Sequence, residues 1–97
     1  MNHKINLALQ VVPRANNIDS YHLVDKAIEI IEASGVPYKV CPFETVMEGD
    51  YGQLMDIVKK VHEACYDAGT ETMMTYIKIQ SSATNDVTIA DKMEKYE

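Results

Sequence analysis

The sequence contains no tryptophan, one phenylalanine and two cysteines, and its nine basic residues are outnumbered by fifteen acidic ones. The net charge of -6 repels the phosphates of nucleic acids and anionic lipids. No apolar run approaches the roughly 20 residues that a membrane-spanning helix requires. The first residues lead directly into a strand pattern, without the apolar core of a signal peptide. We therefore expect a cytoplasmic protein with neither a nucleic-acid nor a membrane partner.

Motifs for covalent catalysis and metal binding are also missing. There is no GxSxG elbow and no phosphate loop, and Cys41 and Cys65 form no CxxC pair. His62 and Cys65 share one helical face, but a structural zinc site needs four ligands and no others are near in sequence. We expect two reduced thiols, no catalytic residues, no metal and no cofactor, and hence a protein that is not an enzyme.

The residues that are present are those of a folded protein, with 46% hydrophobic and 25% charged residues. Residues 1–97 are expected to form one domain. Apolar residues alternate with others from residue 5 to residue 12, which predicts a strand, and Pro13 is expected to end it. The next helix is expected to begin at Asp19 or Ser20 and to stop at Gly35.

Two further strands are predicted at residues 38–41 and 45–48. Their connection is too short for a crossover, so they should form an antiparallel hairpin. Asp50 is expected to cap a second helix, which ends at Gly69. Residues 72–80 are rich in threonine, tyrosine, isoleucine and methionine, which favours a fourth strand.

A short helix is expected to begin at Thr88, with Asp91 answering the cap. The order of elements is therefore βαββαβ with a terminal helix. This order predicts an α/β (α+β) fold, a ferredoxin-like sandwich with two helices on one face of a four-stranded antiparallel sheet. The other face would carry Ala8, Gln10 and Val12, which are not consistently polar. An apolar open face implies a partner, and we expect a homodimer or homotetramer packed through it.

The hairpin holds the most promising polar residues. Glu44, Glu48 and Asp50 are carboxylates that can accept N–H donors from a ligand with charge assistance. Glu44 and Asp50 also suit solvated turn positions, and Asp50 suits a helix cap. Glu48 lies inside a strand, where acidic residues are depleted, so ligand binding and a structural role are equally supported there. The hydroxyl of Thr45 suits either a ligand or the turn backbone.

Gln10 lies on the side of the first strand away from the core. Its amide offers both a donor and an acceptor, either to a ligand on the sheet or to a neighbouring subunit. The tyrosines and methionines favour core and interface packing, although they could also line a flexible pocket.

The chain resembles the small thiamine-binding protein family, once described as uncharacterised. The resemblance covers nearly the whole length and rests on residues 11–13, residues 34–38, Pro42 with residues 45–49, and residues 89–93. It implies a ferredoxin-like fold, assembly into dimers or tetramers, and binding of thiamine or its pyrimidine moiety without chemistry.

Thiamine carries a cationic thiazolium and an aminopyrimidine with N–H donors. With the resemblance as a guide, Glu44 or Glu48 would accept the amine. Gln10 and Thr45 would hold the pyrimidine edge, and Phe43 would cover the ring.

The chain departs from the family pattern at Arg14-Ala15 and at Phe43-Glu44, where the hairpin is bulkier than in many members. The predicted function is non-catalytic binding of thiamine or hydroxymethylpyrimidine, for sequestration or delivery of the vitamin. The alternative is a homo-oligomeric regulatory or interaction module without a small-molecule ligand.

Overall fold

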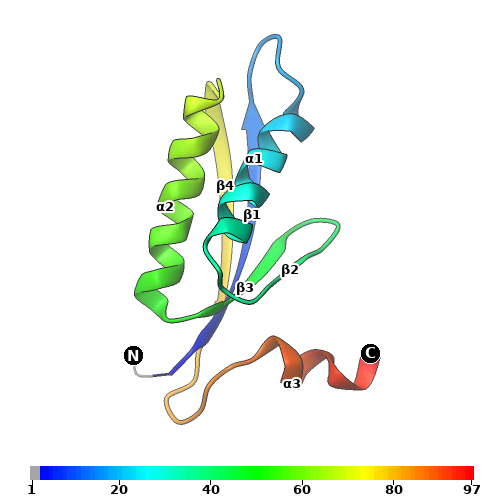
Figure 1. The fold of residues 1–97 in the computed structure, drawn as a ribbon, viewed down its shortest axis with the longest axis vertical. Helices are drawn as coiled ribbons and strands as arrows, with labels where there is room; N and C mark the ends of the chain where they lie inside the picture. The colour runs from blue at the N-terminus through cyan, green and yellow to red at the C-terminus, as the bar shows by residue number, and fades with distance from the viewer. Residues whose placement is uncertain (1–2) are drawn as a thin grey trace.

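The structure, a computed structural model, describes residues 3–97. Helices α1 (Ser20–Ala33) and α2 (Tyr51–Asp67) cover one face of a four-stranded antiparallel sheet (Figure 1). The strands, in the order β2-β3-β1-β4, are β1 (Ile5–Arg14), β2 (Tyr38–Val40), β3 (Thr45–Gly49) and β4 (Thr72–Gln80). A short helix α3 (Ile89–Met93) and a 3-10 turn (Glu94–Tyr96) follow. The predicted ferredoxin-like arrangement is confirmed.

The helices begin and end close to the predicted residues. Asp19 caps α1 by accepting the N–H of Tyr21 at 3.0 Å. Gly35 and Gly69 follow the two long helices with φ values of +79° and +111°, a region that favours glycine. Asp50 is the N-cap residue of α2, as predicted, but its side chain makes no capping hydrogen bond. The backbone of Asp50 is extended, and the helix begins at the next residue, Tyr51.

The end of β1 is a second correction, because the strand continues through Pro13 to Arg14. β3 pairs with β1 only as far as Leu9, whereas β4 follows β1 to Arg14. The last residues of β1 therefore have a strand on one side only. Proline, which cannot donate to a ladder, is tolerated on such an edge.

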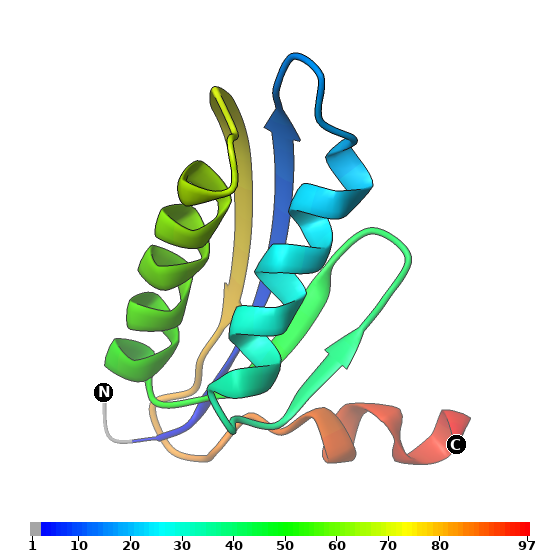
Figure 2. The same cartoon turned by 45° about the horizontal axis from the view of Figure 1, so that its top comes forward.

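The hydrophobic core lies between the sheet and the two long helices (Figure 2). Strand alternation sends Ile5, Leu7 and Leu9 of β1 toward the helices, where each is at most 4% exposed. The helices contribute an apolar stripe each, and the fully buried members include Leu23, Ile31, Leu54 and Val61. This core fixes the position of α1 over β1, and the site described below depends on that position.

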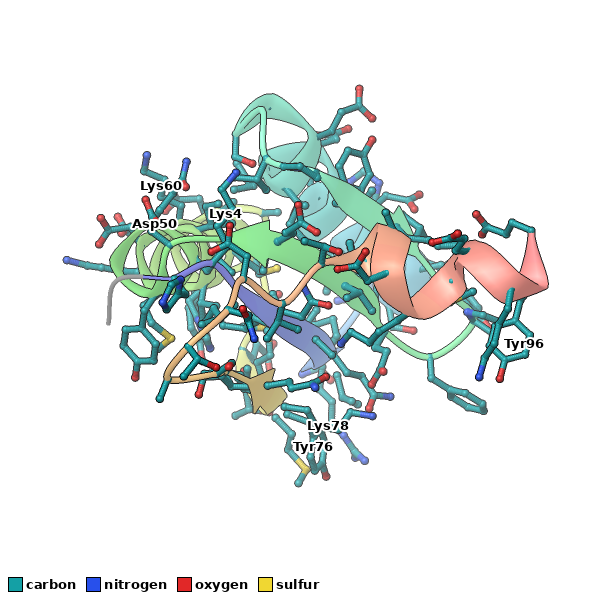
Figure 3. All side chains as sticks on the ribbon, turned by 90° about the horizontal axis from the view of Figure 1, so that it is seen from below. Lys4, Asp50, Lys60, Tyr76, Lys78 and Tyr96 are labelled. Carbon is teal, nitrogen blue, oxygen red and sulfur yellow. The ribbon has the colours of Figure 1, made fainter. Side chains whose placement is uncertain are left out.

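The opposite face of the sheet is covered in part. α3 lies against its β3 side, where the main-chain N–H of Ile89 donates to Glu48 Oε1 at 2.7 Å. The β1–β4 side remains exposed, and Figure 3 shows Tyr76 and Lys78 pointing away from the long helices. No helix within residues 3–97 is long and apolar enough to cross a membrane.

Candidate functional site

A small notch lies between α1, the middle of β1 and the β2–β3 hairpin, and it has a volume of about 80 Å³. Its wall on α1 is apolar and is formed by Val24, Ala27, Ile28 and Ile31. Its opposite wall is the hairpin, residues 40–45, and its floor is formed by residues 9–11 of β1. We call this space the notch.

The notch exists because the strands differ in length. β3 stops pairing with β1 at the Leu9–Thr45 pair, so the hairpin tip projects beyond the ladder. The tip is closed by a hydrogen bond from the Cys41 N–H to the Glu44 carbonyl oxygen, 2.9 Å long. On the helix side the small side chain of Ala27 leaves room that a larger residue would fill.

Thr45 and Phe43 both border the notch but differ in exposure. Thr45 is 6% exposed and lies opposite Leu9 and Val40 in the ladders, so its side chain faces the helices. Phe43 is 81% exposed at the hairpin tip. An exposed phenyl ring beside an apolar hollow is a surface that a planar ligand would cover.

Glu44 supplies the carboxylate at this site. Its Oε1 atom lies 2.9 Å from Nζ of Lys78 on β4, and the Glu44 side chain is only 25% exposed. Lys78 is 73% exposed, so it is free to move away when another cation or N–H donor approaches. Lys78 lies on the open face of the sheet, so the ion pair holds the Glu44 carboxylate on that side of the hairpin, away from α1.

Gln10 borders the notch from β1. Strand alternation directs its side chain toward the open face of the sheet, together with Ala8 and Val12. In the described part of the chain, β1 has no strand on its β3 side from Gln10 onward. Main-chain donors and acceptors of this segment are therefore available at the rim of the notch. No residue pattern predicted this unpaired edge.

Four of the five predicted site residues, Gln10, Phe43, Glu44 and Thr45, border the notch, but the Gln10 side chain faces the other side of the sheet and only its main chain is at the rim. Glu48 is not among them. It lies opposite Asn6 on the other face of the sheet, and its carboxylate accepts the N–H of Ile89. We infer that Glu48 holds α3 against the sheet.

The wall on α1 was missed by sequence reasoning, because its apolar spacing is that of any core-facing helix. The sequence feature that could have indicated a hollow at this wall is the small Ala27 within a stripe of larger aliphatic residues. Cys41 and Pro42 also border the notch, and neither was among the predicted site residues.

A wider groove of about 800 Å³ begins where the notch ends. It runs between the last residues of β1 and the start of α1, toward Arg14 and Tyr21. The groove shares Gln10, Val11 and Val24 with the notch, so the two spaces are adjacent. A ligand with its ring in the notch would have room for a substituent along this groove.

His62 and Cys65 have other partners. His62 Nδ1 lies 2.9 Å from the Val58 carbonyl oxygen, and Nε2 lies 2.8 Å from the hydroxyl of Thr75. Cys65 donates weakly to the Leu23 carbonyl oxygen, and burial raises the pKa of its thiol. Within residues 3–97, no group of three or more His, Cys, Asp or Glu side chains is placed to hold a metal ion.

Comparison with known sequences finds a matching family model and similar relatives over nearly the whole chain. A family model described as thiamine-binding protein matches residues 7–97. A UPF0045 protein of Clostridium perfringens is 40% identical over 91 residues, which is 94% of this chain and 95% of the relative. A UPF0045 protein of Methanothermobacter thermautotrophicus is 32% identical and covers 93% of each chain.

Solved structures share the fold. A domain of unknown function from Bacillus cereus superposes with a TM-score of 0.94 at 43% identity, covering 98% of this chain and 91% of the other. A Thermotoga maritima protein with a provisional assignment to thiamine biosynthesis or salvage superposes with a TM-score of 0.88 at 29% identity, covering 97% and 99%.

Proposed function

Because the chain belongs to the thiamine-binding protein family, we propose that it binds thiamine or its hydroxymethylpyrimidine moiety in the notch, without converting it. The observation that carries this proposal is one apolar hollow bordered by Phe43, Thr45, the Glu44 backbone segment of the hairpin and the main chain of Gln10. Sequestration or delivery of the vitamin is the role that such binding would serve.

The apolar wall of α1 suits the face or edge of a planar ring. Engineered cavities of about 150 Å³ admit benzene, so a notch of about 80 Å³ takes an aromatic ring only in part. Phe43 is exposed and free to close over the remainder. A ring held between Phe43 and the aliphatic side chains of α1 would gain the apolar burial that drives most small-ligand binding.

Polar groups at the rim suit an aminopyrimidine. The free edge of β1 after Leu9 offers main-chain donors and acceptors to ring nitrogens and to the amine. Thr45 borders the notch, and the Glu44 carboxylate would have to leave Lys78 on the open face to meet an N–H donor or the thiazolium charge. The net charge of -6 favours a cationic ligand over an anionic one.

Replacing Ala27 by leucine should fill the notch from the helix side. Ala27 is 3% exposed and lines the hollow, so the added carbon atoms occupy the space of the ligand ring. We expect thiamine affinity to fall at least about tenfold, which corresponds to about 1.4 kcal/mol. Overpacking should cost at most about 1–3 kcal/mol of stability. Titration calorimetry with thiamine and with hydroxymethylpyrimidine measures the affinity directly.

The matched control is Ala33→Leu, which adds the same atoms to an exposed position of the same helix. This variant should bind thiamine as the unmodified protein does. Equal binding by the Ala27 and Ala33 variants would show that the ligand site is not the notch.

We also propose that a second copy of the chain covers the β1–β4 half of the open sheet face. Met74 and Tyr76 are 56% and 50% exposed there. In this half Lys78 is paired with Glu44, and Arg14 adds a positive charge, so the face does not share the net charge of -6 of the whole chain. Two copies would repel each other less through this face than elsewhere, and apolar residues would become buried.

A charged residue at the centre of this face should break the assembly. Tyr76→Glu is expected to yield a monomer of 10.9 kDa in sedimentation experiments in which the unmodified chain sediments as a dimer or tetramer. Tyr66→Glu makes the same change on α2, away from the face, and should leave the assembly intact. An unmodified chain that sediments as a monomer at micromolar concentration contradicts this proposal.

A further inference from the structure

On the basis of the function proposed above, we propose that the main chain of Val11 recognises the ligand. It does so through one N–H donor and one carbonyl acceptor. The site then accepts heterocycles in which a ring nitrogen lies beside an exocyclic amine, and it rejects their oxo analogues. Val11 is partly buried and borders both the notch and the wider groove.

The register of the sheet fixes which main-chain groups of β1 face the notch. In an antiparallel ladder a residue directs its N–H and C=O to the same neighbouring strand, and successive residues alternate between the two neighbours. On β3, the Glu48 N–H donates toward β2, to the Pro37 carbonyl oxygen at 3.0 Å. Thr45, three residues earlier, therefore faces β1, and its partner Leu9 faces β3. Val11, two residues after Leu9, points the same way.

The opposite side of β1 agrees with this assignment. The Arg14 carbonyl oxygen accepts the Glu71 N–H at 2.8 Å, next to the start of β4. Even-numbered residues of β1 thus face β4, and Gln10 and Val12 pair with that strand. Within residues 3–97 the β3 ladder ends at Leu9, so no strand lies on the side to which the Val11 groups point.

The free edge of β1, residues 10–14, has a single main-chain donor. Only Val11 and Pro13 direct main-chain groups to this edge, and proline has no N–H. Figure 2 shows the tip of the β2–β3 hairpin diverging from β1, which leaves the edge open. A proline at an edge discourages pairing with an added strand. One donor beside an acceptor suits a small ring instead.

An aminopyrimidine matches the two groups of Val11. The ring nitrogen beside the amine accepts the Val11 N–H, and the amine donates to the Val11 carbonyl oxygen. These are the bonds that a residue of a neighbouring strand would make. The ring then lies in the plane of the sheet, in the place that a longer β3 would take. One face of the ring lies toward the apolar side chains of Val24 and Ile28 on α1.

The order of the two groups along β1 also sets the direction of the ligand. The N–H of a residue precedes its C=O in the chain, so the amine lies on the Pro13 side of Val11. In thiamine, the ring carbon that bears the thiazolium arm is next to the carbon that bears the amine. The arm therefore points toward Arg14, along the wider groove. The donor–acceptor order and the position of the groove select the same orientation.

An oxo ring carries the opposite pattern, a ring N–H beside a carbonyl oxygen. In the orientation set by the groove, its donor would face the Val11 N–H and its acceptor the Val11 carbonyl oxygen. Turning the ring over would restore both bonds but would direct the arm at the end of the notch that the Leu9–Thr45 pair closes. The site therefore rejects the oxo ring in either orientation.

The test compares thiamine with oxythiamine, its oxo analogue, by titration calorimetry on the full chain. The two compounds are matched in size and both carry the thiazolium charge. Thiamine should bind about ten- to a hundredfold more tightly, as expected for two neutral hydrogen bonds. In a parallel titration the Val11 amide proton should shift downfield with thiamine and not with oxythiamine.

Two variants separate the main chain of Val11 from its side chain. Val11→Pro removes the N–H without removing a ladder bond, because this N–H faces the free edge. The preference for thiamine over oxythiamine should fall by about three- to tenfold, the value of one neutral hydrogen bond. Val11→Ala keeps the N–H and should keep the preference, even where packing losses weaken both ligands. If Val11→Pro fails to fold, the amide shift of the unmodified chain decides.

The outcomes distinguish this inference from the proposed function. Equal affinities for thiamine and oxythiamine, with both compounds shifting residues of the notch, would overturn the role of Val11 and leave thiamine binding intact. A Val11→Pro protein that keeps the full preference would overturn it as well. Absence of any saturable thiamine shift at the notch would overturn both proposals together.

Discussion

Replacement of Leu9 by alanine is expected to lower the free energy of unfolding by about 2–5 kcal/mol, the range for removing a buried leucine side chain. Leu9 is 4% exposed, belongs to the core cluster and also forms part of the notch floor. The existing hollow becomes larger, so the surrounding atoms have less opportunity to collapse into the vacated space. A small domain has about 5–15 kcal/mol of stability in total, and this loss is a large part of it.

Urea unfolding followed by circular dichroism measures this effect. The matched control is Val11→Ala, the next helix-facing residue of β1, which lies beyond the end of the β3 ladder and is only partly buried. It should cost less than Leu9→Ala, because fewer of its contacts are fully buried. A loss below about 1 kcal/mol for Leu9→Ala would mean that β1 is not packed beneath α1 as described.

The second large effect concerns Glu48. Its carboxylate accepts the Ile89 N–H at 2.7 Å, and hydrogen bonds to charged groups contribute about 1.5–3 kcal/mol. Glu48→Ala should therefore release α3 from the sheet. Hydrogen exchange at the amides of α3 should accelerate by about 10- to 100-fold, which is that free energy expressed as a rate ratio. Exchange in β1 and α2 should change little.

Two comparisons sharpen the result for Glu48. Glu48→Gln keeps an acceptor of the same shape and retains a neutral hydrogen bond of about 0.5–1.5 kcal/mol, so it should lose only the difference, about 1–1.5 kcal/mol. Asp50→Asn alters a carboxylate whose side chain makes no capping bond and should leave α3 unaffected. In all three variants thiamine affinity should be unchanged. A Glu48→Gln protein with weakened thiamine binding and an intact α3 would return Glu48 to the ligand site.

The fold was predictable because its local signals agree with one another. The hairpin followed from a connection too short for a crossover, and the ends of the long helices followed from Gly35 and Gly69. The prediction that β1 ends at Pro13 was wrong, because the rule against proline in strands applies to strands with a neighbour on both sides. A side-chain capping hydrogen bond from Asp50 was not predictable, because residue type alone does not show whether a carboxylate turns back to the helix N–H groups.

The site was only partly predictable. Thr45 and Glu48 are three residues apart in one strand, so alternation places them on opposite faces, and no single pocket takes both. That separation was available from the sequence. The partner of Glu48 was not, because Ile89 is 41 residues away and their contact depends on how α3 returns across the sheet. The unpaired edge of β1 depends likewise on the unequal lengths of two strands.

The central claim is that a thiamine-type ligand binds between α1 and the β2–β3 hairpin. Backbone chemical-shift mapping with thiamine and hydroxymethylpyrimidine tests it most directly. The account predicts that the largest shifts occur at residues 9–11, at residues 24–28 and at residues 41–45, with α3 and Glu48 little affected. Shifts concentrated on α3 and Glu48, or no saturable shift with either compound, would contradict it.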